Sequence, residues 1–174
     1  MELLAWLEQT DFSTWLRESD WGYPVVLCVH AVGMGMVVGI SFMYSARILG
    51  YSKAFPLTAF DKLFDLAWFG FAMNAVSGVL LFVGEPRRLF VTPAFWIKMI
   101  LIAFAGLSLW VLAKALHGTA HYGADDLPGK DEALAGDGVV TTSAKVAAII
   151  SIVFWLGAIT AGRLIGYTIP PPPL

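Results

Sequence analysis

Five polar residues lie within long apolar stretches of this chain, and they are the residues most able to do chemistry. They are His30, Asn74, Ser77, Lys98 and Arg163. Charged and imidazole side chains are costly in hydrocarbon, so those found there usually face the protein interior and serve a purpose. If successive helices alternate in direction, all five residues fall in the same half of a membrane, with His30 roughly 8 to 10 Å inside. The sequence therefore predicts a polar site in one half of the bilayer.

An imidazole nitrogen is a standard axial ligand of haem iron, so His30 is a candidate ligand for b-type haem. Gly33 lies on the same helical face and leaves the backbone open to a flat molecule. The second axial position stays open: it could be a thioether, an empty site or a histidine of another subunit. The thioethers at suitable positions are those of Met34, Met36 and Met73. Guanidinium groups bind carboxylates in a bidentate fork, which suits the haem propionates; the candidates are Arg87, Arg88 and Arg163.

A quinone is the closest alternative ligand, with His30 and Arg163 donating hydrogen bonds to its two carbonyl groups. For either ligand the predicted cofactor-binding residues are His30, Met34, Met73, Asn74, Lys98 and Arg163, with His30 as the metal ligand for haem. A structural interpretation is also open. Lys98 and Arg163 can extend their charged ends to the membrane surface, while Asn74 and Ser77 hold helices together by hydrogen bonds.

Other patterns carry less weight. His117 and His121, near Asp125 and Asp126, have a spacing that could hold a divalent metal, but we favour solvated loop histidines. Gly35 and Gly39 indicate a close contact between helices, as does the group Ala158, Gly162 and Gly166. The large aromatic residues are expected to face lipid; they include Trp68, Trp96, Trp110 and Trp155.

Four apolar stretches must position the polar residues: 25–49, 66–84, 94–116 and 146–167. Each is long enough to cross a bilayer of roughly 30 Å as a helix. The predicted fold is all-α, an integral membrane four-helix bundle with an N-terminal interfacial amphipathic helix. Its parts are an interfacial segment at 1–23, the bundle at 24–168 and a proline-rich tail at 169–174. Four spans place both termini on the same side of the membrane, and we favour the outside.

Short sequence signals mark the ends of these parts. Leu3, Leu4 and Leu7 recur at helical spacing, and Asp11 can cap a second short helix. The segment 118–143 is rich in Gly and Asp and predicts an exposed loop. The run of prolines from Pro170 to Pro173 cannot continue a helix.

Composition supports a membrane location and excludes several functions. Hydrophobic residues make up 58% of the chain and charged residues only 14%. A net charge of −2 gives no basic surface for nucleic acid. The single cysteine, Cys28, allows neither an intrachain disulfide nor a thiolate metal cage.

Three short motifs carry a resemblance to known membrane proteins. They are His30 followed by small residues, Trp96-Ile97-Lys98 opening the third stretch, and Trp155 with Gly162-Arg163 in the fourth. With these motifs the chain resembles bacterial four-helix membrane proteins of unknown function and, more distantly, copper-resistance D-type and cytochrome b-type membrane proteins. In the cytochrome-type proteins, helix histidines carry b haem, and His30 is the position that matches. The resemblance implies electron transfer or quinone chemistry in a bacterial inner membrane.

Three functions follow from these observations. The first is a redox subunit that carries haem or quinone and exchanges electrons with partner subunits. The second is a non-catalytic subunit that assembles or anchors a larger membrane complex, or that associates with itself. The third is a small transporter, which the absence of an internal proline or an inverted repeat disfavours.

Overall fold

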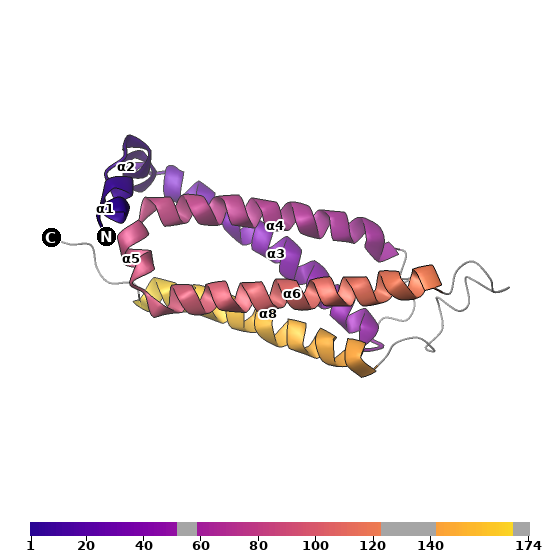
Figure 1. The fold of residues 1–174 in the computed structure, drawn as a ribbon. Helices are drawn as coiled ribbons and strands as arrows, with labels where there is room; N and C mark the ends of the chain where they lie inside the picture. Colours follow the sequence, from indigo (N-terminus) through magenta and orange to yellow (C-terminus); the bar gives the residue numbers. More distant parts are fainter. Residues whose placement is uncertain (52–58, 123–141, 169–174) are drawn as a thin grey trace.

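The computed structural model describes residues 1–51, 59–122 and 142–168, and every regular element among them is a helix (Figure 1). This agrees with the predicted all-α class. The helices in chain order are α1 (Glu2–Glu8), α2 (Asp11–Glu18), α3 (Gly22–Ile48), α4 (Ala59–Gly84), α5 (Pro86–Phe90), α6 (Pro93–Tyr122) and α8 (Thr142–Thr168).

Three of these helices are long and apolar enough to cross a membrane: α3, the part of α4 from Leu63 to Gly84, and α8. The described side chains of α6 add a shorter apolar helix, Pro93–Ser108. These helices leave many large apolar side chains exposed, among them Val32, Phe69, Val79, Ile100 and Val153. Apolar surface on this scale is unsuited to water, whereas a lipid environment accommodates it, with the backbone polar groups paired inside the helices.

The long helices associate as two pairs. The α3 helix packs along α4, and α6 packs along α8, while α3 crosses to α8 and so joins the pairs. In the part of the chain that is described, the backbones of α4 and α6 stay apart, although the rings of Phe82 and Phe95 stack between them with centroids 5.6 Å apart, and in Figure 1 α3 crosses diagonally behind both helices. The side of the molecule between α4 and α6 is therefore closed mainly by side chains.

The closest approach between backbones is that of α3 and α4, and glycines allow it. A Cβ atom on Gly33 would lie 2.8 Å from the backbone nitrogen of Asn74 and 2.9 Å from the carbonyl oxygen of Gly70. The face of Gly33 is thus filled by α4, so the prediction that it stays open for a flat ligand is wrong. Gly35 and Gly39 have no neighbour within 4 Å of a built Cβ, which contradicts their predicted role in a helix contact.

The first two helices pack against the end of α4. Thr10 caps α2, accepting a hydrogen bond from the backbone of Ser13, so the cap is one residue earlier than the predicted Asp11. The Ser13 hydroxyl donates to the carbonyl of Val83 at 2.8 Å. Leu16 is fully buried, and a Cβ on Gly84 would meet its side chain at 3.3 Å. These contacts fix α2 beside the end of α4.

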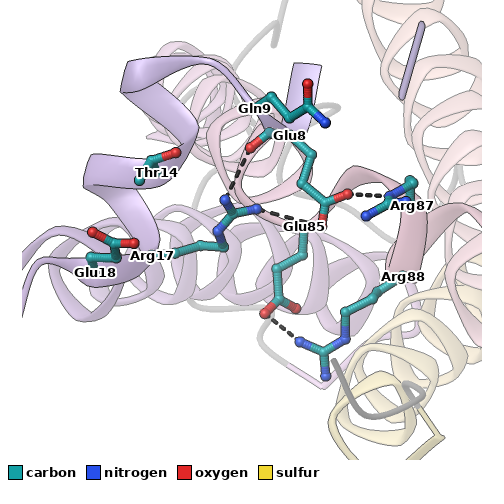
Figure 2. A pocket seen from close by; sticks show the side chains of 8 residues that line it. All are labelled: Glu8, Gln9, Thr14, Arg17, Glu18, Glu85, Arg87 and Arg88. Atoms are coloured by element: carbon teal, nitrogen blue, oxygen red, sulfur yellow. Dashed lines mark hydrogen bonds and ion pairs between the residues drawn. The ribbon is translucent and has the colours of Figure 1, made fainter. Parts of the chain in front are cut away.

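Charged residues complete this attachment and surround an open cleft of about 490 Å³ (Figure 2). Glu8 of α1 forms ion pairs with Arg17 of α2 and Arg87 of α5, while Glu85 pairs with Arg88. Arg17 also donates to the Gly84 carbonyl at 3.2 Å. Glu8 therefore connects three helices, although its side chain is only 13% exposed.

We expect Glu8→Gln to release α1 without disturbing the long helices, because the substitution removes the charge that holds two arginines. Amide hydrogen exchange in residues 2–8 should speed up, while exchange in α3 and α4 stays unchanged. Glu18→Gln is the matched control, since Glu18 is exposed on the same cleft and makes no ion pair among the described residues. Equal effects of the two substitutions would contradict the connecting role of Glu8.

Several helix ends differ from the predicted ones. The α4 helix begins seven residues before the predicted position 66, since Asp61, Lys62 and Asp65 are polar but compatible with a helix. The short α5 was not predicted; Pro86 occupies its first turn, where a missing N–H costs nothing. The α6 helix continues past 116 to Tyr122, through Gly118, because one glycine costs only about 1 kcal/mol in a helix. The α8 helix begins at Thr142, four residues before the predicted position 146, so it includes the last two residues of the predicted loop. Residues 123–141 of that loop and the proline-rich tail lie outside the described residues.

Candidate functional site

Four of the five polar residues named from the sequence meet at one point between α3, α4 and α6. His30 is the centre: its Nδ1 lies 3.0 Å from the carbonyl oxygen of Asn74 and 3.1 Å from the hydroxyl of Ser77. Its Nε2 lies 3.2 Å from Nζ of Lys98. The amide of Asn74 donates back to the carbonyl oxygen of His30 at 2.8 Å. We refer to His30, Asn74, Ser77 and Lys98 as the histidine cluster.

These partners determine which nitrogen of His30 carries the proton. A carbonyl oxygen can only accept, so Nδ1 is the protonated nitrogen and donates to Asn74. The remaining lone pair on Nε2 then accepts a hydrogen bond from the ammonium group of Lys98. The imidazole is 9% exposed, and a Cβ added to Gly78 would lie 3.2 Å from its Cε1, so α4 packs closely around the ring.

Lys98 reaches the cluster from the beginning of α6. Its stem passes Gly162 of α8, where a built Cβ would lie 3.6 Å from Lys98 Cε. Among the described residues Lys98 forms no ion pair with a carboxylate, and its partner is the neutral imidazole of His30. A cation without a counterion at this depth retains capacity to donate to, or attract, an additional group.

A small hollow of about 10 Å³ lies beside the cluster, where the four long helices meet. Its lining combines two polar residues of the cluster with apolar and aromatic side chains: Asn74, Lys98, Met34, Val37, Phe71, Ile102, Trp155 and Ala158. This volume corresponds to about one water molecule. The hollow is the place where a ligand could reach Lys98.

Trp155 is the functional candidate that the sequence interpretation missed. It was expected to face lipid, but it is only 4% exposed, and its indole Nε1 is buried with no hydrogen-bond partner among the described residues. By contrast, Trp68, Trp96 and Trp110 are each about half exposed. The sequence did contain a signal for the burial of Trp155, because it shares the helical spacing of small residues that are buried on one face of α8. These small residues are Ala144, Ala148, Ser151 and Ala158.

The other predicted site residues lie apart from this point. Met34 lines the hollow, but Met73 does not, and its carbonyl accepts from Ser77. Arg163 is exposed on α8 and does not join the cluster. Arg87 and Arg88, considered for haem propionates, are paired with Glu8 and Glu85.

The predicted metal pair falls partly outside the description. His117 and His121 lie in the helical course of α6, but their side chains are outside the described residues. Within the described part of the chain, no group of three His, Cys, Asp or Glu side chains could hold a metal ion.

Haem does not fit the site in this arrangement. Iron must bind the lone pair of Nε2, and Lys98 Nζ occupies that direction at 3.2 Å. The face of Gly33, where a porphyrin was expected, is filled by the α4 backbone. Haem binding would require Lys98 to leave and α3 to separate from α4.

Comparisons with protein-family models, with curated proteins and with solved structures found no match to this chain. The resemblance to copper-resistance D-type and cytochrome b-type proteins thus stays a prediction.

Proposed function

We propose that this chain is a membrane-embedded electron-transfer subunit that binds a quinone in the hollow beside Lys98. One observation carries the proposal: Lys98 has a neutral partner instead of a carboxylate, and it lines the same hollow as the unpartnered indole of Trp155. Both groups are hydrogen-bond donors, and a quinone presents two carbonyl acceptors on an apolar ring. The remaining lining is apolar and aromatic, which suits that ring.

The bilayer supplies the path by which the quinone reaches the site. Because the backbones of α4 and α6 stay apart, the side of the hollow between them is closed by side chains such as Phe71 and Ile102. Phe71 is 41% exposed and can swing toward lipid. The hollow as it stands has room for about one water molecule, so ring binding requires these two side chains to part.

The cluster also supplies charge and a proton. As a quinone takes up two electrons, negative charge develops on its oxygens, and a fixed ammonium group stabilises that charge. Two protons complete the conversion to quinol: the Lys98 ammonium can donate one and becomes a neutral amine that still donates a hydrogen bond to His30, while water supplies the second proton and then reprotonates the amine. The electrons come from or go to a partner redox subunit.

For the membrane arrangement, we infer that α6 is a fourth span and that the four long helices form one bundle with both termini on the same side. The α1 and α2 helices then lie at the interface, where Trp6, Trp15 and Trp21 are all exposed. We propose the inner membrane of a bacterium, with the termini outside.

Lys98→Met tests the binding site, because methionine keeps an apolar stem of similar length and removes the donor. We expect affinity for a short-chain quinone to fall at least about tenfold, or about 1.4 kcal/mol. Binding to purified protein in lipid nanodiscs is the measurement, with Lys145→Met as control because Lys145 is exposed at the start of α8. Oxidised and dithionite-reduced absorption spectra of the same samples would reveal haem if it were the cofactor.

An assembly or anchoring subunit is the second candidate, and one observation favours it. The histidine cluster is internally hydrogen-bonded, so it can serve simply to lock α3, α4 and α6 together. The apolar faces on either side of the α4 and α6 opening could receive a helix of another protein. Wild-type protein that binds no quinone, shows no visible absorbance and purifies with a stoichiometric partner would establish this function instead.

A further inference from the structure

Three buried side-chain atoms have no hydrogen-bond partner in the described part of the chain, and all three lie on α3 or α8. They are Ser45 Oγ, Ser151 Oγ and Trp155 Nε1. Ser45 and Ser151 are fully buried. A buried polar group without a partner costs about 1 to 3 kcal/mol, and ordered water is the usual remedy. Their gathering on two facing helices requires a common explanation.

Five other serine and threonine hydroxyls of the long helices behave differently. Each donates to a backbone carbonyl three or four residues earlier in its own helix, which is the usual solution within a membrane. These hydroxyls belong to Ser41, Ser77, Ser108, Thr160 and Thr168. Ser45 and Ser151 do not use this local bond, so their hydroxyls remain available to another group.

The packing of α3 against α8 places these atoms in order across the membrane. Val37 and Val38 cluster with Trp155, whereas Tyr44 and Ile48 cluster with Ala144 and Ala148. The two helices therefore run antiparallel. Ser151 and Ser45 lie between Trp155 and the far ends of the helices, the ends opposite to α1 and α2. We call this line of contact the α3–α8 seam.

The spacing along the seam suits water bridges. Ser151 is one turn, about 6 Å, from Trp155 along α8, and Ser45 lies about 5 Å from the end of α3. One water molecule with two hydrogen bonds of about 2.8 Å bridges groups up to about 5 Å apart, so a path along the seam needs several water molecules in file. On α3, Ser41 lies between the level of Trp155 and Ser45. Its hydroxyl donates a hydrogen bond to the carbonyl oxygen of Val37 and can still accept a hydrogen bond from water. The α8 residues that face α3 here, Ala144 and Ala148, are buried and have small side chains.

At its inner end the seam meets the hollow, because Trp155 lines the hollow together with Asn74 and Lys98. At its outer end Arg47, also buried, lies two residues beyond Ser45. Polar groups thus recur from Lys98 to the far ends of α3 and α8 at intervals of up to about two turns of helix, or about 11 Å, which two or more water molecules in file would bridge.

We propose that the α3–α8 seam holds a single file of water that connects the far membrane surface with the hollow beside Lys98 and admits hydrated protons to it. The use of these protons at a quinone rests on the proposed function, whereas the water path itself does not. The path would let protons reach the site from the surface opposite to α1 and α2.

Cysteine accessibility to the small cation Ag⁺ tests the path, since a thiol ionises and reacts with Ag⁺ only where water reaches it. Cys28 is exposed and is first replaced, as Cys28→Ser. Ser45→Cys and Ser151→Cys are then made singly in full-length protein in liposomes. The control is Thr160→Cys on the same helix α8, because Thr160 is exposed on an apolar helix and bonded to its own backbone.

We expect Ag⁺ to block later thiol labelling of Ser45→Cys and Ser151→Cys at least about tenfold faster than that of Thr160→Cys, and faster from the surface opposite to α1 and α2. Melting temperatures equal to that of the Cys28→Ser background verify that each variant folds. Adding Ser151→Val to Ser45→Cys should leave the cysteine at position 45 reactive, because position 45 lies nearer the far surface than position 151 does. Blocking no faster than in Thr160→Cys, or faster access from the other surface, would overturn the path. Since no quinone is present, this outcome is independent of quinone binding.

Discussion

Gly33→Val should abolish the stable association of α3 with α4 and is expected to be the most damaging single substitution in the chain. The built Cβ at this position would lie 2.8 Å from a backbone nitrogen and 2.9 Å from a backbone oxygen of α4. Backbone atoms within a helix cannot give way as a flexible side chain can, so the helices must separate along their length. We expect a loss of about 3 kcal/mol or more in the free energy of unfolding, at or beyond the upper end for overpacked sites.

The same change at Gly35 provides the control, because Gly35 is on the same helix with nothing within 4 Å of a built Cβ. Gly35→Val should leave stability unchanged or slightly raised, since glycine is a poor helix former. Gly70→Val should resemble Gly33→Val, because its Cβ would lie 2.8 Å from Met36 Cβ. Unfolding in mixed micelles measures all three variants. Equal stability of Gly33→Val and Gly35→Val would contradict the packing of α3 on α4.

The contrast between Gly33 and Gly35 shows where sequence interpretation stops. The lengths of the apolar stretches predicted the long helices, because a helix in lipid needs about twenty apolar residues whatever its neighbours are. However, α3 is apolar on all sides, so its sequence does not indicate which face meets α4. The rotation of a helix about its own axis is decided by packing. Only the structure therefore shows that Gly33, and not Gly35, is the glycine in contact with α4.

The histidine cluster was predictable for a similar reason, but only in part. Counting residues from the helix ends gives depth, and depth placed His30, Asn74 and Lys98 in the same half of the membrane. Depth says nothing about which atoms meet. The return bond from Asn74 to the His30 carbonyl and the engagement of Nε2 by Lys98 depend on helix rotation and side-chain rotamers, and they decide that iron has no free lone pair.

Charge pairing was the other limit. Arg87 and Arg88 were considered as partners of the haem propionates because a guanidinium group binds a carboxylate in a bidentate fork. Their actual partners are Glu8, nearly eighty residues earlier, and Glu85. The position of Glu8 follows from the docking of α1 and α2 on the end of α4, which no local sequence signal specifies.

The hydrogen bond between His30 and Lys98 leads to the second large effect, which a double-mutant cycle would measure. His30→Ala removes the acceptor of the Lys98 ammonium and leaves that cation unpaired within the membrane, whereas Ser77 and Asn74 keep their bonds to backbone carbonyls. We expect a loss of roughly 1 to 3 kcal/mol in the free energy of unfolding, toward the upper end because the unpaired group is charged. Lys98→Met should cost less, since it removes the cation that needs a partner.

The double variant His30→Ala with Lys98→Met is therefore expected to be more stable than the sum of the single losses predicts, by roughly 1 to 3 kcal/mol. Glu85→Gln with Arg88→Met is the matched comparison, because that pair lies outside the long helices and is partly exposed, so its coupling should stay below about 1 kcal/mol. Additive losses at His30 and Lys98, within about 0.5 kcal/mol, would mean that Lys98 finds water or a lipid headgroup once His30 is absent. Lys98 would then be a residue that extends to the membrane surface, and a quinone could not rely on it as a fixed donor. Strong coupling instead means that the ammonium group is held in place before a ligand arrives, which is the condition for it to stabilise charge on that ligand.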